Sequence, residues 1–467
     1  MAAMASMEHG YRLNLPGVQN FIAGLVLFGT VGIYVAISAL GAGGGKSTSV
    51  EMNNIVSSVN YGVFTVTGFF GGSIINRFGP RWSILLGAFG YPFYVAGLFY
   101  YDRVGNLAFP VVGGAVIGAT ASQLWTGVNY IAFAYADENN KGRFYGTQAA
   151  MKAAGNVVAS ALTLGLTANN RSSSGVPTAV YVAFICIMLA AMALAVLVVK
   201  PEKVRRRDGT AIAIFHHDSF KQEFQAVARL VFDHKAMLLV PCLIVADFQL
   251  ILQPQISAKF FNTRTRSLLT FVAAIVEVIA TLGFGLLLDH PAWPRRVRAK
   301  VGILLMSLLI FGIYSGEAGW LFRVISAAEL ASEPAYDWTD PSFAGFFVIF
   351  VVFNTLGSVA PVYIAWLLAS LTNDPKKSAA YAGLLRSAMA AGVAIGFGIA
   401  SAGVTIRTQF VIQIVTQFLA IGPQIWVAFR YVRDTNYGLE DDVIIPEEVL
   451  EGIEKVTMSA VPEKGLS

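Results

Sequence analysis

Long apolar runs separated by short polar loops dominate the chain. Twelve of them approach or exceed the ~20 residues that a helix needs to cross the hydrocarbon core of a bilayer. In lipid, only helices and closed barrels satisfy every backbone polar group, and runs of this length are typical of helices. The pattern predicts an all-α polytopic membrane protein with spans at residues 18–40, 55–75, 82–100, 107–135, 146–168, 178–199, 236–257, 268–288, 301–321, 343–371, 379–404 and 407–431. The ninth is the least clearly marked by its hydropathy, because Glu317 interrupts its outer end.

A long polar stretch divides the spans into six and six. We predict an N-terminal tail (1–17), a six-helix bundle (18–199), a central loop (200–235), a second six-helix bundle (236–431) and an acidic tail (432–467) that we expect to be mobile. In the central loop, Phe220, Phe224, Val227 and Val231 recur at helical spacing. This favours an amphipathic helix on the inner membrane surface, with a solvated linker as the alternative.

Basic residues in the loops predict the orientation. The loops that share a side with both termini hold Arg77, Arg81, Lys141, Arg143, the basic stretch 295–300, Lys376 and Lys377. The opposite loops hold the more scattered Lys46, Arg103, Arg171, Lys259, Arg264, Arg266, Arg323 and Arg407. The positive-inside rule therefore places both termini in the cytoplasm. Asn170 begins an Asn-x-Ser sequon in an outer loop and is the glycosylation candidate.

Composition agrees with a membrane protein, since charged residues make up 13% of the chain against about 25% in soluble domains. The net charge of +5 is spread over short loops and does not indicate a nucleic-acid partner. Neither a metal-ligand cluster, nor a nucleophile with a base, nor a cofactor motif is present. We therefore expect a non-enzyme that lies in the lipid bilayer and needs no cofactor. The plasma membrane is the default location, with the vacuole or another endomembrane as alternatives.

Two related stretches suggest two related halves. Residues 68–81 (GFFGGSIINRFGPR) and 283–300 (GFGLLLDHPAWPRRVRAK) each link two apolar runs, and aligning Gly72 with Gly285 places Asn76 on Asp289. With twelve spans split six and six, the Gly-x-x-x-Asn-Arg-x-Gly-x-Arg turn resembles the signature of the major facilitator superfamily. The resemblance implies two pseudo-symmetric six-helix bundles and a gating motif made of Gly72, Asn76, Arg77, Gly79, Arg81, Asp289, Arg295 and Arg296.

In that family the motif's acid and arginines hold the two halves together on the cytoplasmic side while the outer side is open. Asn76 replaces the usual Asp, which keeps a hydrogen bond and removes a charge. Residues 123–127 (QLWTG) followed by 135–143 (YADENNKGR) are similar to a run in the fungal Unc-93-like branch. Members of this branch are described as transporters or as partners of ion channels, so the resemblance leaves both functions open.

Ionisable residues inside apolar runs are costly and mark function by default. Asp247 and Glu277 each lie near the middle of a span, and Lys152 and Arg386 occupy related spans of the two halves. The acids could couple transport to protons or act as interhelical contacts; the cations suit an anionic substrate or an acid partner, or could extend to the surface. A central wet cavity between repeats is favoured by further polar and aromatic residues, among them Gln123, Trp125, Asn129, Gln249 and Gln253.

The sequence thus predicts a secondary-active transporter of a small organic solute that works by alternating access and can be proton-coupled. The alternative is a non-transporting Unc-93-like scaffold that regulates a channel or receptor and has a membrane-protein partner. The retained acids favour transport, and Asn76 favours the scaffold.

Overall fold

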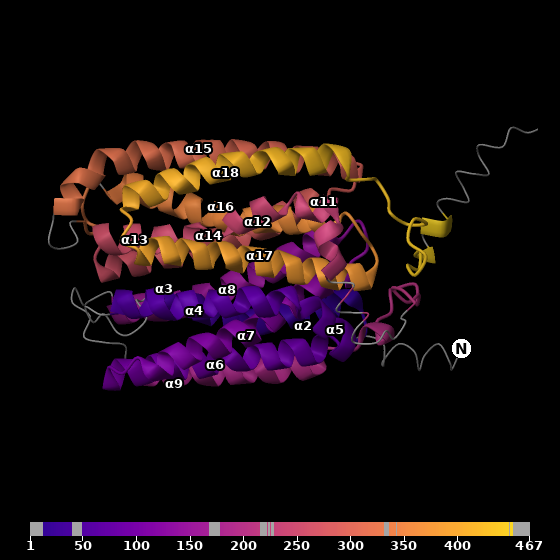
Figure 1. Ribbon diagram of the computed structural model, residues 1–467, viewed down its shortest axis with the longest axis horizontal. Coiled ribbons are helices and arrows are strands. Elements are labelled where there is room, and N and C mark those ends of the chain that lie inside the picture. Colours follow the sequence, from indigo (N-terminus) through magenta and orange to yellow (C-terminus); the bar gives the residue numbers. More distant parts are fainter. Residues whose placement is uncertain are drawn as a thin grey trace, which may run out of the picture.

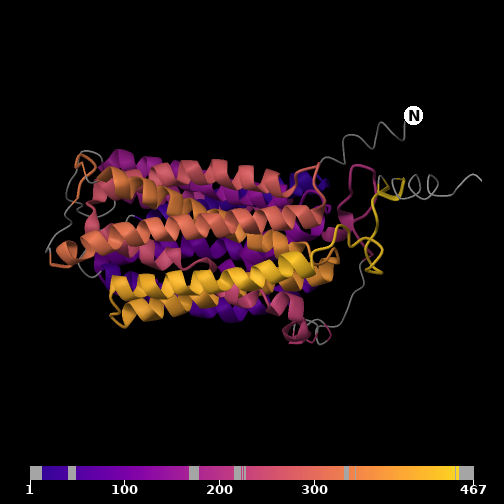
Figure 2. The same cartoon turned by 90° about the horizontal axis from the view of Figure 1, so that it is seen from above.

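The computed structural model describes residues 13–39, 49–167, 178–214, 222, 225, 228–330, 336–341, 343–447 and 449–451. These residues are mostly helical, and the β structure within them is limited to isolated bridges. The long helices run roughly parallel in one elongated bundle (Figures 1 and 2). The described residues therefore confirm the predicted all-α membrane fold.

The first half of the chain forms one side of the bundle (Figure 1). Its first span consists of two α-helices joined by a π-helical segment, Phe28–Gly32, and its fourth ends in a second π-helical segment, Ile131–Tyr135. The α-helices are α2 (Pro16–Leu27), α3 (Ile33–Ala39), α4 (Ser49–Phe69), α5 (Gly71–Phe78), α6 (Pro80–Val104), α7 (Ala108–Tyr130), α8 (Lys141–Thr167) and α9 (Thr178–Leu194).

The second half packs against the first along the whole length of the bundle (Figure 1). Its helices are α11 (His234–Met237), α12 (Val240–Ala246), α13 (Gln249–Phe260), α14 (Thr263–Leu288), α15 (Arg295–Leu330), α16 (Phe343–Ala369), α17 (Pro375–Ser401) and α18 (Ile406–Arg430).

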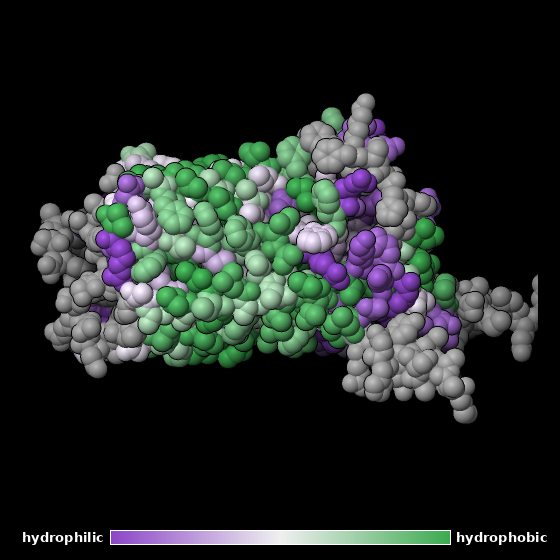
Figure 3. Space-filling view, turned by 90° about the horizontal axis from the view of Figure 1, so that it is seen from below, coloured by the Kyte–Doolittle hydropathy of each residue, from purple (hydrophilic) through white to green (hydrophobic). Residues whose placement is uncertain are grey.

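Ten helical segments among the described residues are long and apolar enough to cross a membrane. The helices α4 and α8 are also long, with 21 and 27 residues, and complete the twelve predicted spans. Both are less apolar because they carry asparagines, glutamine and lysine on faces that look into the bundle. Figure 3 shows apolar side chains over the middle of the bundle and hydrophilic ones gathered toward its ends, as lipid surroundings require.

The two halves meet through α8 against α14 and α4 against α17. Glycines make the first contact close: a Cβ added to Gly142 would lie 2.6 Å from the carbonyl oxygen of Gly285, and one added to Gly146 would lie 2.8 Å from that of Thr281. Small residues allow such backbone approach between membrane helices. The α8–α14 pair thus joins the halves along one side of the interface.

The ninth span is present, and α15 continues unbroken from Arg295 to Leu330 through Glu317. The seventh span is present as predicted, and its helix is divided into α11, α12 and α13. One expectation needs correction. The tail is not free at its beginning, since residues 436–447 contact the central loop and the helix ends. Most of the predicted amphipathic helix, and Asn170, lie outside the described residues.

Candidate functional site

Two features of the bundle concern function: a cavity between the halves and a set of contacts at one end. We call the end where α2 begins and α18 ends the termini end, and the opposite one the far end (Figure 1). The cavity has a volume of about 400 Å³ and is lined by helices of both halves. Its wall runs from mid-bundle residues such as Asn129 and Arg386 to residues near the far end, such as Asn53 and Ser257.

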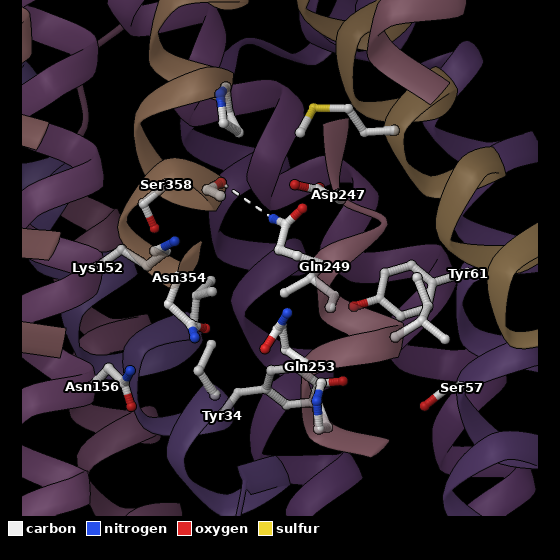
Figure 4. A pocket seen from close by; sticks show the side chains of 18 of the residues that line it. Tyr34, Ser57, Tyr61, Lys152, Asn156, Asp247, Gln249, Gln253, Asn354 and Ser358 are labelled. Atoms are coloured by element: carbon white, nitrogen blue, oxygen red, sulfur yellow. Dashed lines mark hydrogen bonds between the residues drawn. The ribbon is translucent and has the colours of Figure 1, made fainter. Parts of the chain in front are cut away.

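The cavity wall contains eight of the nine residues predicted for substrate or coupling. Figure 4 shows Lys152 on one side and Tyr61 on the other, with Asp247 and Gln249 between them. The eight are Trp125, Asn129, Lys152, Asp247, Gln249, Gln253, Glu277 and Arg386. The ninth, Gln123, is not among the lining residues; its amide donates to the Thr67 carbonyl at 3.2 Å and joins α7 to α4.

Asp247 lies at a break in the seventh span. The backbone hydrogen bonds there join residues three apart instead of four apart, as in the bond from the Leu250 amide to the Asp247 carbonyl at 3.0 Å. Asp247 ends α12, and α13 starts two residues later at Gln249. Discontinuous helices at the repeat interface are a recurrent way to expose polar groups to a substrate site. The break therefore brings the carboxyl group to the cavity, where an unbroken helix could have buried it.

Arg386 connects the two halves across the cavity. Its Nη2 donates to the Tyr145 hydroxyl at 2.7 Å and to the Asn129 Oδ1 at 3.3 Å, and the guanidinium lies 3.8 Å from the centre of the Trp125 ring. Because Trp125 and Asn129 are one helical turn apart on α7, one face of this helix holds the arginine by a hydrogen bond and a cation–π contact.

Two residues of the site are not among those predicted from the sequence. Arg266, counted above as an outer-loop cation, lies inside α14 and lines the cavity. Glu317 is fully buried behind the wall and accepts a 2.6 Å hydrogen bond from the Gln253 amide. Glu317 lies in an apolar run, and this position could have indicated a functional role. It was interpreted instead as an interruption of the ninth span. Glu317 thus fixes one lining side chain from outside the cavity.

At the termini end, buried polar contacts join the halves. Lys141, which is 2% exposed, donates from α8 to the backbone carbonyls of Ala369 and Thr372 at 2.7 and 2.6 Å. Glu138 of the first half forms an ion pair with Arg295 of the second at 3.1 Å. Both residues are buried, so this pair holds the two halves in a low-dielectric setting. In the sequence, Glu138 and Lys141 belong to the run that resembles the Unc-93-like branch, and nothing in that run indicates that they join the halves.

The second copy of the gating motif also contacts the first half. Asp289, which follows α14, accepts hydrogen bonds from the backbone amides of Gly142 at 2.9 Å and Arg143 at 2.5 Å. Burial raises the pKa of Asp289 to about 6, and the two amide donors oppose the shift. Arg296 instead pairs at 3.7 Å with the exposed Asp434 of its own half. Of the second copy, Asp289 and Arg295 therefore bridge the halves.

The first copy of the motif contributes mainly by packing. Gly72 lies against α17, where an added Cβ would be 2.7 Å from the carbonyl oxygen of Ala379. Gly79 has φ of 80°, which suits glycine at the turn between α5 and α6. Arg81 donates to the Val198 carbonyl at 2.5 Å, within its own half. Arg77 is exposed, and Asn76 is partly buried.

The central loop and the tail form a layer over the termini end, which we call the loop–tail layer (residues 205–214 and 436–447). A β-bridge joins Ala213 to Val443, and Arg206 donates to the Ile444 carbonyl at 3.0 Å and pairs with Asp137 of the first half at 2.7 Å. The backbone amide of Asn436 donates to Glu138 at 2.6 Å. The layer therefore touches the charged groups that join the halves.

Comparison with known proteins agrees with this architecture. Residues 20–328 match the family model of the Major Facilitator Superfamily. An uncharacterized membrane protein of Schizosaccharomyces pombe is 35% identical over 420 residues, covering 90% of this chain and 85% of that protein. A UNC93-like protein of the same yeast is 28% identical over 433 residues, covering 91% and 84%.

The crystal structure of the Escherichia coli fucose:proton symporter FucP has the same fold, with a TM-score of 0.58 and 13% identity over 88% of this chain and 98% of that one. The family match spans well over half of the chain, and the bundle, the cavity and the two motif copies agree with it. The chain therefore belongs to the major facilitator superfamily and is similar to its UNC93-like members.

Proposed function

We propose that the chain is a secondary transporter that moves a small organic solute across its membrane by alternating access. The main support for this proposal is the cavity of about 400 Å³, which is lined by charged residues of both halves. Carriers bind their substrates at the interface of two repeats, and two rigid halves can rock around such a site. Family membership supports the same activity.

In this proposal the termini end faces the cytoplasm, as the basic loops favour. Buried contacts hold that end closed, and the cavity wall continues toward the far end. The conformation is then the outward-facing one, ready to take up a solute from the outer side. The inward-facing conformation requires that the Glu138–Arg295 pair and the Lys141 contacts separate.

We propose further that Asp247 or Glu277 couples transport to protons. Each carboxyl group lines the cavity from a spanning helix of the second half. Among the described residues, neither acid has a basic group within 4 Å, so neither charge is neutralised by an ion pair. A carboxyl group that lines the cavity without a fixed ion-pair partner is available to bind and release a proton during transport.

The test is solute flux into proteoliposomes under an imposed pH gradient, with a panel of organic acids, peptides and sugars. Asp247→Asn or Glu277→Gln should abolish gradient-driven flux if that acid is the coupling group. Asp102→Asn is the matched control, because Asp102 is a buried acid of α6 that does not line the cavity. Flux that survives both substitutions would discard these acids as coupling groups and retain the carrier.

The second candidate function is a non-transporting membrane scaffold that regulates a channel or receptor. Similarity to UNC93-like proteins and Asn76 in the first motif support it. It predicts that folded protein gives no flux with any solute of the panel and that a membrane-protein partner co-purifies from cells. A plasma-membrane location is the default proposal, and fluorescence microscopy of the tagged chain would distinguish it from a vacuolar or other endomembrane location.

A further inference from the structure

The cavity holds a buried positive charge that cannot be neutralised by losing a proton. Arg386 is 9% exposed, and its hydrogen-bonding partners Tyr145 and Asn129 are both neutral. Its Nε has no hydrogen-bond acceptor, and among the described residues no carboxylate oxygen lies within 4 Å of the guanidinium. A guanidinium stays protonated in proteins, and a buried charge is costly until it has a counter-ion.

Two more donors lie on the same helices as these partners. The Asn129 Nδ2 is buried and has no acceptor, although the Oδ1 of the same amide already contacts Arg386. Lys152 follows Tyr145 by two helical turns on α8, so both look into the cavity from one face. In the described part of the chain, Lys152 has no ion pair or hydrogen-bond acceptor. Three kinds of N–H donor thus lack an acceptor at this part of the wall.

The two acids of the cavity are in a different position. Asp247 and Glu277 also line the cavity, and in the described part of the chain neither forms an ion pair with Arg386 or Lys152. A carboxyl group can also become neutral by protonation, which the guanidinium of Arg386 cannot do by deprotonation. The unmet requirement of the wall is therefore for negative charge.

The rest of the wall indicates what the anion is attached to. Aromatic rings of Tyr61, Tyr91 and Trp125 supply apolar contact area. Three lining oxygens, the Oδ1 of Asn60, the Oδ1 of Asn156 and the Oε1 of Gln253, are buried and have no donor. Buried acceptors of this kind select ligands that present an O–H or N–H group.

We propose that the cavity binds organic carboxylates whose body carries a hydroxyl or amide N–H group, with Arg386, Asn129 and Lys152 holding the carboxylate. This deepens the proposed transport function and rests on it for the direction of movement, but binding can be measured without transport. The matching solute has one carboxylate, an apolar ring or chain and one further hydrogen-bond donor.

The experiment compares carboxylates with their neutral amides on the purified full-length protein. The pairs are benzoate and benzamide, mandelate and mandelamide, and hippurate and hippuramide, each tested by thermal stabilisation and by competition with radiolabelled hippurate. We expect mandelate and hippurate to bind at least about tenfold more tightly than their amides. Charge-assisted hydrogen bonds contribute more binding free energy than neutral ones, and the difference corresponds to about this ratio of affinities. Benzoate, which lacks the second donor, should bind more weakly than mandelate.

Variants locate the site. Arg386→Gln and Lys152→Gln should each weaken hippurate at least about tenfold, whereas Arg386→Lys should keep part of the affinity because it keeps the charge. Lys377→Gln is the matched control, since Lys377 lies on the same helix as Arg386, is exposed and pairs with Asp233 outside the cavity. Size-exclusion chromatography checks folding, and Lys152→Gln provides an independent test if Arg386→Gln does not fold.

Amides that bind as well as the carboxylates, or carboxylate binding unchanged in both cavity variants, would overturn the inference. Carboxylate-selective binding without flux in proteoliposomes would keep the anion site and refute transport. Flux of neutral or cationic solutes by a protein that does not bind carboxylates would support transport and refute the anion site.

Discussion

Replacing Glu138 by Gln should loosen the termini end of the bundle. The Oε1 of Glu138 lies 3.1 Å from the Arg295 guanidinium in an ion pair, and it accepts hydrogen bonds from the Asn373 side chain and the Asn436 backbone amide, both at 2.6 Å. Glutamine retains an acceptor oxygen for the two neutral donors but removes the charge that Arg295 faces. The variant therefore tests the ion pair rather than the whole network.

The structure sets the size of the effect. Breaking a buried ion pair costs about 3–5 kcal/mol, and the retained hydrogen bonds place Glu138→Gln at the lower limit, about 3 kcal/mol. The cost applies to the closed form, because Glu138 and Arg295 become hydrated when the halves separate there. A change of about 3 kcal/mol shifts the ratio of open to closed molecules by roughly 150-fold.

Thiol accessibility can measure this ratio. Ser370, which is 1% exposed, lies at the closed end, and its carbonyl accepts from the Asn436 side chain at 2.9 Å. Ser370→Cys in a background without Cys186 and Cys242 gives a single thiol that reacts when the end opens. Adding Glu138→Gln should raise the labelling rate in proportion to the open population, by up to roughly 150-fold.

The control is Asp434→Asn at the same end. Asp434 pairs with Arg296, but their side chains are 52% and 60% exposed, so the pair contributes less than about 1 kcal/mol. Equal labelling rates for the Glu138→Gln and Asp434→Asn proteins would refute the reasoning that burial makes the Glu138–Arg295 pair the main lock. An unchanged rate in both would show that the end does not open through this network.

Three further predictions concern other contacts. Gly72→Ala should also speed labelling at the closed end, because its Cβ would lie 2.7 Å from the backbone carbonyl of Ala379. Burial in the closed form raises the pKa of Asp289 to about 6, and hydration in the open form should return it toward the ordinary ~3.9. The closed form should then bind more protons between these values and gain stability as the pH falls through them. Spin-label distances across the termini end should show this stabilisation, and Asp289→Asn should remove it. Glu317→Ala should lower the free energy of unfolding by about 1–3 kcal/mol, because it leaves the Gln253 amide buried without its acceptor, and thermal unfolding measures the loss.

Each of these has a matched comparison. Gly62→Ala on α4 adds a Cβ where no atom lies within 4 Å, so equal labelling in the Gly62→Ala and Gly72→Ala proteins would contradict the steric argument. A pH dependence that persists in Asp289→Asn would assign the proton to another group. Glu317→Gln keeps an acceptor oxygen, so a loss as large as that of Glu317→Ala would show that the hydrogen bond to Gln253 is not the cause.

Run length and hydropathy were enough to predict the all-α fold, since crossing a bilayer restricts the chain to few solutions. The same logic identified Asp247, Glu277, Lys152 and Arg386, because a charge inside an apolar run is conspicuous. The break at Asp247 could not be predicted in this way. It depends on local backbone geometry within a segment whose hydropathy is continuous.

The contacts at the termini end were out of reach for another reason. Glu138, Asn373 and Asn436 are polar residues in polar segments, where the sequence gives no sign of burial. Glu138 and Asn436 become buried, and Asn373 partly buried, only when loops far apart in the chain meet at one end of the bundle. Glu317 was missed for a different reason, because it lies in an apolar run. A single acid there suggests that the span is interrupted, unless its hydrogen-bond partner Gln253 is known.

The loop–tail layer has a consequence for how the protein is made. The amide of Asn436 that caps Glu138 is 298 residues further along the chain. At a synthesis rate of about 5–20 residues per second, Glu138 leaves the ribosome roughly 15–60 s before this cap exists. The first half is therefore synthesised before either partner of the Glu138 carboxylate, Arg295 or Asn436, exists. The final closure of the termini end comes late in synthesis, after α18 has been made.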